Sequence, residues 1–530
     1  MSPPAADKRL LLAGAAAVLV LVLWSARGVL LDPAGLILGD RPDTIHHVWG
    51  QWWMAQSGAE GGLSTWTSYP SGEYGSVLCP LGNLLVRPVE WLGGAVLAYN
   101  LLSVLYLLFD ALAVGLLARR VARSDLAGVV AALAMVVARP VIAHVALGNT
   151  EGAAIGWVAL VAWVGLPWAR GENRLGAVVG LLCGVAVIEN PYSLPILAIV
   201  APALALRRLV AGPGRWRQLA LAAVAGPILP GLRLWQVGEG LGGNFMRHAA
   251  PFDWLGFTWT VWDPDWSLAG WQLLWPWPRM QFPEMTLELY ENGGFAFVGL
   301  VALCLALGGG VLQWRRALPW LGLALLFFLL GLGSTPLGDS GPPGLFLLAN
   351  SVIVQVLPAL TQPLRFLAFG TGALAVAAGV GAARLPSRPW VAPLLLALLV
   401  VEGFTLGGPS IRIPVIDTRG TECLAALEGP VHTLTPTGPT ASANGAALLL
   451  QLVHGQPGTH VGVGGWTRVD EADARSLEER GVRWVLVPEE GLAATTCGGW
   501  SALPLSAWTP ELEQRFAPGQ GPSPQPRPLR

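Results

Sequence analysis

Long apolar runs, separated by short segments rich in arginine, dominate the sequence. Two of them, Leu10–Leu31 and Leu92–Ala118, hold one charged residue each and reach the roughly 20 residues needed to cross the hydrocarbon core of a bilayer. The pattern recurs along the chain and predicts a mainly α, polytopic transmembrane bundle. About eleven spans are expected, at residues 10–31, 91–118, 126–147, 152–168, 175–189, 192–206, 218–236, 293–313, 317–333, 364–383 and 390–407.

Composition supports this prediction and removes two other classes of protein. Of the 530 residues, 53% are hydrophobic and 12% are charged, whereas a soluble domain carries roughly a quarter charged residues. A single soluble fold is therefore excluded. The formal net charge of −1 supplies no basic field, so nucleic acid is excluded as a partner. The lipid bilayer is the partner that the composition predicts.

The arginine clusters predict how the chain is oriented. Positively charged flanks stay on the cytoplasmic side, and Lys8 and Arg9 precede the first span, which places the amino terminus in the cytoplasm. The later clusters then fall on the same side: Arg119, Arg120 and Arg123; Arg170 and Arg174; Arg207, Arg208, Arg215 and Arg217; Arg315 and Arg316; Arg384 and Arg388. Three sizeable segments remain on the periplasmic face, 32–90, 237–292 and the residues after about 408.

Two parts of the predicted membrane region leave alternatives open. The segments 175–189 and 192–206 are short for full spans and meet at Asn190-Pro191, although later spans keep their orientation if neither segment crosses. Pro343–Leu360 is apolar enough to span, but counting it as a span would place Arg384 and Arg388 outside. We therefore interpret it as a re-entrant or interfacial helix.

The composition changes after residue 408. Residues 1–408 are the predicted transmembrane domain, 409–516 are predicted to form a small external α/β domain, and the Pro-rich tail 517–530 is expected to be disordered. Strands are predicted at Ile411–Asp417, Val431–Thr435 and Val482–Pro488, and helices at Asn444–His454 and Asp470–Arg480. Cys423 and Cys497 fall in this domain, where a disulfide between them and two unpaired thiols are both open alternatives.

The first external segment contains the most prominent polar group. Asp40, Asp43, His46 and His47 lie within eight residues of one another, directly after a predicted span. The following stretch, Thr44–Gln56, has helical periodicity, with several tryptophans on one face that predict a helix lying flat on the membrane. Asp43 is a natural N-cap for that helix, and this reading competes with a chemical one. Asp40 lies farther from the helix start, and a carboxylate at the lipid boundary can act as a general base. His46 is a candidate for binding phosphate, or a residue of the polar helix face.

Other polar residues are expected at the outer ends of spans, where an ionisable group usually lines a cavity. His144, Asn149 and Glu151 lie at the turn between the third and fourth spans, and their side chains suit hydrogen bonds to sugar hydroxyls, although a plain turn explains them too. Glu189 lies at another outer turn, beside Asn190 and Tyr192. Glu288, four residues after Glu284, precedes the eighth span and is expected to share a helical face with it.

Motifs for other chemistry are lacking in the sequence. There is no GxSxG, no GxxxxGK[ST] and no CxxC pair among the five cysteines. Asp263-Pro264-Asp265 matches a metal-binding DxD only superficially, because the proline favours a turn. No cofactor is predicted, and a divalent metal ion is left open. The run Gly308-Gly309-Gly310 lies in a predicted span, where small residues allow close helix packing.

Several short motifs resemble one known class of membrane proteins. They are Gly39-Asp40 with Asp43; Trp49 with Trp52 and Trp53; Tyr69-Pro70-Ser71-Gly72; Asn100; Ala143-His144 with Gly148-Asn149; Glu288 to Gly294; and Pro363-Leu364-Arg365-Phe366. In this order they resemble bacterial polytopic proteins related to the GT-C glycosyltransferases, a class that includes protein O-mannosyltransferases and the catalytic subunit of oligosaccharyltransferase. The resemblance covers most of the predicted membrane part.

The resemblance implies transfer of a sugar from a polyprenyl-phosphate carrier to a glycan, lipid or protein acceptor on the outer face. Asp40 matches the catalytic acidic position best, and Asp43 is second. Arg365 matches a recurrent arginine that holds the lipid phosphate, a role that suits a guanidinium; an interfacial anchor is the alternative. The chain departs from better-known members in two ways: no WWD-type triplet follows the last span, and the carboxyl-terminal domain is small.

Two other functions compete with the transferase. A transporter or flippase of lipid-linked saccharides would also need buried polar residues, but it is expected to show internal repeats, which the sequence lacks. A non-catalytic scaffold in envelope polysaccharide assembly is the third alternative.

Overall fold

The computed structural model divides the chain into two compact units. The first contains Met1–Leu30, Leu102–Arg233 and Phe245–Ile413, and the second contains Leu31–Leu101, Leu234–Asn244 and Pro414–Arg530. The structure describes residues 7–39, 42–57, 63–64, 73–74, 79–146, 148, 150–212, 214–237, 249–254, 257–262, 296–332, 345, 365–410, 413, 415–418, 422–433, 450–452, 456, 474–487, 495–497 and 500–512.

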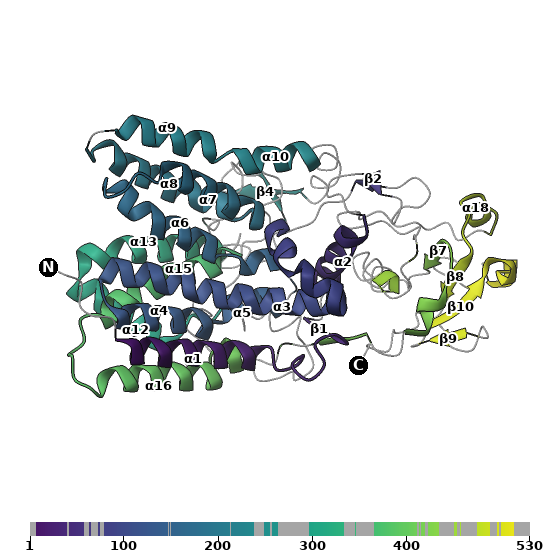
Figure 1. The fold of residues 1–530 in the computed structure, drawn as a ribbon, viewed down its shortest axis with the longest axis horizontal. Coiled ribbons are helices and arrows are strands. Elements are labelled where there is room, and N and C mark those ends of the chain that lie inside the picture. The colour runs from purple at the N-terminus through teal and green to yellow at the C-terminus, as the bar shows by residue number, and fades with distance from the viewer. Residues whose placement is uncertain are drawn as a thin grey trace. The chain divides into compact units, whose positions relative to one another are not determined.

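The first unit is a bundle of helices (Figure 1). Its central helix is α15 (Arg365–Ala382), which is buried along nearly its whole length and packs against α4, α12 and α13. The other elements are α1 (Lys8–Ser25), the second half of α3 (Pro80–Ala122), α4 (Asp125–Val137), α5 (Arg139–Ala146), the 3₁₀ helix η1 (Thr150–Ala153), α6 (Gly156–Ala169), α7 (Gly176–Glu189), α8 (Ser193–Leu209), α9 (Arg215–Ala225), α10 (Ile228–Val237), the antiparallel pair β4 (Ala249–Trp254) and β5 (Phe257–Trp262), α12 (Leu300–Leu312), α13 (Trp314–Gly331), α16 (Val391–Thr405) and η3 (Gly408–Ser410).

Several of these helices meet the requirements for crossing a membrane. Among the described residues, α1, α3, α13 and α15 are each long and apolar enough, and α4 with α5 qualifies as one span bent by 46°. Four more apolar helices, α6, α7, α12 and α16, are shorter. The chain is therefore a multi-pass membrane protein. The count of eleven spans and the orientation stay predictions.

Two predicted spans are each made of two helices. The stretch 126–147 breaks at Ala138, whose backbone is extended, and Pro140 then occupies the first turn of α5, where its missing N–H costs nothing. The stretch 218–236 breaks between α9 and α10 at Gly226-Pro227, because proline cannot donate the backbone hydrogen bond of a helix interior. A hydropathy pattern averages over both breaks.

Glycines set the closest approach of two helices in the bundle. A Cβ on Gly309 of α12 would lie 2.9 Å from the amide nitrogen of Gly381 on α15, and a Cβ on Gly381 would lie 1.9 Å from the carbonyl oxygen of Leu305. Only glycine fits at these positions. The expectation that the run 308–310 serves close helix packing is confirmed at Gly309.

Three helices of the bundle receive their amino-terminal cap from another helix. The carboxylate of Glu402 on α16 accepts hydrogen bonds from the amides of Leu300 (2.6 Å) and Val301 at the start of α12. The side-chain oxygen of Gln218 on α9 accepts from the amide of Gly176 at the start of α7. The carboxylate of Asp110 on α3 accepts from the amide of Gly156 at the start of α6. Because the first amides of a helix have no partner within it, these polar side chains are held inside an apolar bundle for a structural reason.

The second unit contains the segment that follows α1 and the carboxyl-terminal part of the chain. Strand β1 (Leu36–Leu38) pairs antiparallel with β6 (Val415–Asp417), and Gly39 forms a bridge to Val415. The remaining elements are α2 (Pro42–Ser57), the pair β2 (Leu63–Ser64) and β3 (Glu73–Tyr74), the first half of α3, which is kinked at Gly94 (φ 82°), η4 (Glu422–Ala426), β7 (Val431–Thr433), α18 (Ala474–Glu479), β8 (Trp484–Val487), β9 (Thr495–Cys497), β10 (Trp500–Pro504) and η5 (Leu505–Ala507).

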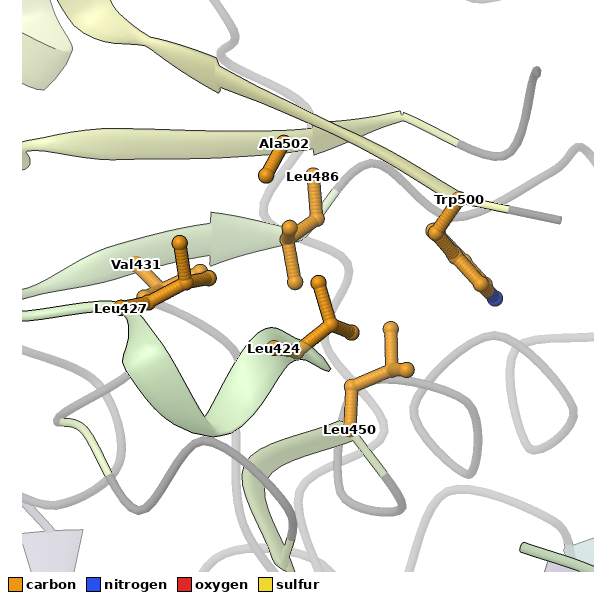
Figure 2. Packing of buried hydrophobic residues seen from close by; sticks show 7 residues of the cluster. All are labelled: Leu424, Leu427, Val431, Leu450, Leu486, Trp500 and Ala502. Carbon is orange, nitrogen blue, oxygen red and sulfur yellow. The ribbon is translucent and has the colours of Figure 1, made fainter. Parts of the chain in front are cut away.

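Four of these strands form one mixed sheet in the order β7-β8-β10-β9. The predicted strands at Val431–Thr435 and Val482–Pro488 correspond to β7 and β8, whereas β9 and β10 were not predicted. Figure 2 shows the apolar cluster that packs on this sheet, formed by Leu424, Leu427, Val431, Leu450, Leu486, Trp500 and Ala502. Cys423, in η4, is disulfide-bonded, and Cys183 and Cys304 are free thiols.

Candidate functional site

Arg365 begins the central helix of the bundle and lies over an aromatic ring. Its guanidinium carbon is 4.7 Å from the centroid of Tyr192, within the range of a cation–π interaction. Tyr192 is 3% exposed and also contacts Phe366 edge-on, at 5.8 Å between ring centroids. Tyr192 therefore holds a half-buried cation at the start of α15.

The turn that carries Tyr192 also carries a buried carboxylate. The backbone amide of Tyr192 donates to the side-chain oxygen of Asn190 (3.0 Å), which shapes the turn between α7 and α8. Glu189, the last residue of α7, is fully buried. Its Oε2 accepts a hydrogen bond from the hydroxyl of Tyr106 on α3. Glu189 and Arg365, predicted as site residues from distant parts of the sequence, are thus brought to one end of the same bundle.

A second buried carboxylate lies one helical turn further along α3. Asp110 is fully buried, and its Oδ1 accepts from the amide of Gly156, at 2.6 Å. Asp110 follows Tyr106 by four residues, so both side chains lie on one face of α3. We call Tyr106, Asp110, Glu189, Tyr192 and Arg365 the polar cluster.

The polar cluster adjoins an apolar cavity of about 60 Å³. Val114, Ile196 and Phe369 line this cavity, and each follows a member of the polar cluster by four residues on its own helix: Asp110, Tyr192 and Arg365. One helical turn is 5.4 Å. The site is therefore amphipathic, with charged and hydroxyl groups at one level and only apolar side chains at the next.

The depth of the polar cluster in the bundle follows from the length of α3. The arginine-rich end of this helix carries Arg119 and Arg120. Tyr106 precedes Arg120 by 14 residues, or about 21 Å along a helix, roughly two-thirds of a 30 Å hydrocarbon core. The polar cluster thus lies in the half of the bundle opposite the arginine-rich end, at a depth where ionisable groups are costly and usually functional.

His144 lies on α5, next to η1. It is 3% exposed, and its ring packs against Gly152 so closely that a Cβ there would lie 2.4 Å from Nδ1. Helix α5 and η1 both contact α15. Glu151 is part of η1, but its side chain lies outside the described residues, as does Asn149.

The remaining candidates belong to segments that the structure describes in part or not at all. Asp40 and Glu288 lie outside the described residues. Asp43 is in the first turn of α2, but its side chain is not among those described. His46 is half-buried on the same helix. The structure therefore tests none of the roles predicted for these residues.

The tryptophans of α2 are buried in protein. Trp49, Trp52 and Trp53 are at most 9% exposed, Trp49 stacks on Trp53 at 6.0 Å, and the indole N–H of Trp49 donates to Oε1 of Gln451 at 2.7 Å. The expectation that this face of the helix lies on the membrane is wrong. Periodicity identified an apolar face correctly but could not show that the carboxyl-terminal segment supplies its partner.

Asn100 of α3 fixes the backbone that leads to Asp40. Its Oδ1 accepts from the amide of Leu38 (2.9 Å), and its Nδ2 donates to the carbonyl oxygens of Pro33 (2.8 Å) and Leu36 (2.7 Å). Asn100 is 3% exposed. Strand β1 is thus held both by β6 and by one buried side chain.

Within the described residues, no three His, Cys, Asp or Glu side chains gather in a way that could hold a metal ion. The Asp263-Pro264-Asp265 segment lies outside those residues. The polar cluster itself has two carboxylates. Glu189 accepts from the hydroxyl of Tyr106, and Asp110 accepts from the amide of Gly156 at the start of α6.

Two residues of the polar cluster were missed by sequence reasoning. Tyr106 and Asp110 lie within an apolar run, and Asp110 is the only charged residue of Leu92–Ala118. A carboxylate at the centre of a span is itself a functional signal, so this one was available from the sequence. Tyr106 gave no such signal, because a tyrosine in an apolar run is an ordinary packing residue.

No protein-family model and no curated protein matches the chain. Among solved structures, the chain is similar to the oligosaccharyltransferase of Archaeoglobus fulgidus tethered to an acceptor peptide, with 12% identity, 92% of this chain and 70% of that chain covered, and a TM-score of 0.47. It is similar to the arabinofuranosyltransferase AftD from Mycobacteria, with 13% identity, 93% and 36% covered, and a TM-score of 0.48. It is also similar to ArnT from Cupriavidus metallidurans bound to undecaprenyl phosphate, with 15% identity, 90% and 90% covered, and a TM-score of 0.39. These proteins are members of the GT-C glycosyltransferase superfamily, the class that the sequence resembles.

Proposed function

We propose that the chain is a membrane glycosyltransferase that moves a sugar from a polyprenyl-phosphate donor to an acceptor on the periplasmic face of the bacterial inner membrane. The proposal rests on the sequence motifs and on the amphipathic site at the start of α15. The acceptor is a glycan, a lipid or a protein.

The observation that carries the proposal is the position of Arg365 one helical turn from an apolar cavity. A polyprenyl phosphate has a compact anionic headgroup on an apolar tail, and the site offers a guanidinium over Tyr192 at one level and apolar side chains at the next. Guanidinium groups bind phosphate in a planar, two-pronged geometry. Arg365 would therefore hold the phosphate, with the first part of the isoprenoid directed toward the cavity.

The reaction needs a base and a stabilised leaving group. In the proposed step, a hydroxyl of the acceptor attacks the anomeric carbon of the sugar while the Asp40 carboxylate takes the hydroxyl proton. The bond between the anomeric carbon and the phosphate oxygen breaks, and polyprenyl phosphate leaves with the bonding electron pair. Arg365 offsets the negative charge that develops on that phosphate. Asp43 is the second candidate for the base.

The other predicted polar residues would contact the donor or the acceptor. Glu189 precedes Tyr192, the residue whose ring lies under Arg365, by three residues. Its bond from Tyr106 fixes the orientation of its carboxylate. His144 lies on α5 and Glu151 on η1, and we propose that they contribute to sugar binding together with Asn149, Glu288 and His46.

The test is release of free polyprenyl phosphate by the purified full-length chain from a polyprenyl-phosphate sugar. We expect release that depends on an added acceptor and is abolished in Asp40→Asn. Arg365→Gln is expected to weaken donor binding and to slow release by at least tenfold, because a charge-assisted contact to phosphate is worth about 1.5–3 kcal/mol.

Arg27→Gln is the matched control for Arg365. Arg27 also lies over an aromatic ring, at 5.0 Å from Trp24, and its guanidinium donates to the backbone carbonyls of Trp24 and Pro409. Intact release in Asp40→Asn would remove Asp40 as the base. Movement of labelled lipid across liposomes by wild-type chain that releases no polyprenyl phosphate would establish the transporter instead, and inactivity in both assays would favour the scaffold.

A further inference from the structure

A second, larger cavity lies in the first unit between α1, α3 and α4. Its volume is about 260 Å³, and its lining includes Leu11 and Ala15 of α1, Leu108, Leu112 and Arg119 of α3, and Ala132 of α4. Leu112 is 59% exposed, so the cavity is a groove open to the surroundings of the bundle. We call it the α1–α3 groove.

The length of the α1–α3 groove matches one leaflet of a bilayer. Along α3 it runs from Leu108 to Arg119, eleven residues or about 16 Å at the rise of an α-helix. This is roughly half of the 30 Å hydrocarbon core. Between these ends the lining is apolar and includes three glycines, Gly14, Gly115 and Gly128, so that the groove floor is smooth enough for an alkyl chain.

The groove ends at a cluster of cationic side chains. Arg119 lines the groove itself, and its Nε lies 2.6 Å from Asp125 Oδ1 while 42% of its side chain stays exposed. Lys8 lies one turn before Leu11 on α1, and Arg123 lies one turn after Arg119; both are exposed. Arg9 is exposed beside Lys8. Two carboxylates belong to the same end: Asp125, which pairs with Arg119, and Asp7, whose backbone amide donates to Asp125 Oδ2.

We propose that the α1–α3 groove binds an anionic glycerophospholipid of the arginine-side leaflet. One acyl chain lies in the groove, and the phosphate and anionic headgroup lie against Arg119, with Lys8 and Arg123 nearby. Charge complementarity selects this occupant over a zwitterionic lipid. The groove and the apolar cavity beside the polar cluster share no lining residue, so the groove is a separate site from the donor site proposed above.

The bound lipid would fill the space between α1 and α3. Helix α1 packs mainly on α4, with further contacts to α16, and the groove is the space that this packing leaves open toward α3. An acyl chain there would supply the dispersion contacts that the exposed apolar groove walls lack, so that lipid binding stabilises the first unit.

The test is native mass spectrometry of the full-length chain with phosphatidylglycerol, and with phosphatidylcholine of the same acyl chains as the headgroup control. We expect phosphatidylglycerol to bind more tightly and to raise the thermal unfolding temperature. Arg119→Gln is expected to weaken binding about fivefold, since one basic residue near a lipid surface contributes about 1 kcal/mol. Arg170→Gln, at the end of α6 and outside the groove lining, should leave binding unchanged.

A steric pair of variants tests the position of the acyl chain. Ala15→Phe places a ring in the groove and should abolish the preference for phosphatidylglycerol. Ala16→Phe adds the same ring to the neighbouring exposed position of α1, outside the groove lining, and should retain it. Arg119→Gln leaves the helix faces intact and keeps the test valid if Ala15→Phe does not fold.

Three results would overturn the proposal. The first is equal binding of phosphatidylcholine and phosphatidylglycerol by the wild-type chain. The second is phosphatidylglycerol binding that Ala15→Phe and Arg119→Gln both leave unchanged. The third is displacement of phosphatidylglycerol by polyprenyl phosphate in the wild-type chain but not in Ala15→Phe, which would assign the groove to an isoprenoid. Release of polyprenyl phosphate is a separate measurement, so failure here leaves the proposed transferase standing.

Discussion

The hydroxyl of Tyr106 on α3 donates a hydrogen bond to Oε2 of Glu189 at the end of α7, and both residues are at most 5% exposed. This bond joins two helices inside the apolar bundle and orients the carboxylate that precedes the turn of Asn190 and Tyr192. It also places a strong acceptor where water has little access. A buried acceptor that loses its donor retains the full cost of its desolvation, so the two partners should respond differently to substitution.

Tyr106→Phe removes the donor and leaves the Glu189 oxygen without it. We expect the free energy of unfolding to fall by about 1–3 kcal/mol. It is measured by unfolding the purified protein, held in a mild detergent, with increasing amounts of a denaturing detergent. Glu189→Gln keeps an oxygen that accepts from Tyr106 and should cost less. If Tyr106→Phe is as stable as wild type, the hydroxyl does not support the carboxylate.

The contact between α12 and α15 gives a second prediction. Gly381→Ala introduces a Cβ that would lie 1.9 Å from the carbonyl oxygen of Leu305, so the helices must move apart. We expect a loss of about 1–3 kcal/mol or more, the usual cost of overpacking. Gly308→Ala is the control on α12 itself, because nothing lies within 4 Å of a Cβ there; it should gain about 0.5–1 kcal/mol from helix propensity. Equal effects of the two variants in the same unfolding titration would contradict the packing argument.

The apolar runs alone predicted where the helices of the bundle lie, because burial in lipid demands about 20 apolar residues whatever the rest of the fold does. They could not predict the breaks at Ala138 and Gly226-Pro227, which depend on a few backbone dihedral angles. Neither could they show that Asp110 and Glu402 cap helices far from them in the sequence. Those contacts exist only after the helices have packed.

The candidate site shows the same limit. Glu189 was predicted from its place at the end of a span and Arg365 from the resemblance to the GT-C class, but their association through Tyr192 is a product of tertiary packing. Trp49 shows the reverse case. Its apolar helix face was predicted correctly, but Gln451, its partner, is 402 residues away, and no local pattern contains that information.

Asn100 provides a prediction for the segment that leads to Asp40. Asn100→Leu removes an acceptor from the Leu38 amide and donors from the carbonyls of Pro33 and Leu36. We expect the Leu38 amide to exchange its hydrogen with solvent at least about fivefold faster, because the loss of its partner costs about 1–3 kcal/mol. Since Asp40 follows Leu38 by two residues, the proposed release of polyprenyl phosphate should also slow, mainly in kcat.

Asn83→Leu is the matched control for Asn100→Leu. Asn83 is also a buried asparagine of α3, but its side-chain oxygen accepts from Gln51 on α2 at 2.8 Å. This variant should leave exchange at Leu38 close to the wild-type rate. Protection of Leu38 that survives in Asn100→Leu would show that pairing with β6 alone holds β1.

The buried histidine of β7 predicts how the carboxyl-terminal sheet responds to acid. Burial, with a smaller contribution from repulsion by Arg480, lowers the pKa of His432 to about 4 from its ordinary value of 6.5. Between these two pH values the folded sheet holds His432 neutral, while the unfolded chain takes up a proton there. The unfolded state therefore binds more protons, and stability falls as the pH drops from 6.5 toward 4. This lowering of the His432 pKa from 6.5 to about 4 corresponds to a loss of about 3 kcal/mol in the free energy of unfolding.

Hydrogen exchange of the β7 and β8 amides, corrected for the intrinsic rate at each pH, measures this loss. His432→Gln removes the titrating group, so its stability relative to wild type should improve by about the same amount across this window. A constant difference between the two proteins from pH 7 to pH 4 would mean that His432 titrates normally in the folded sheet.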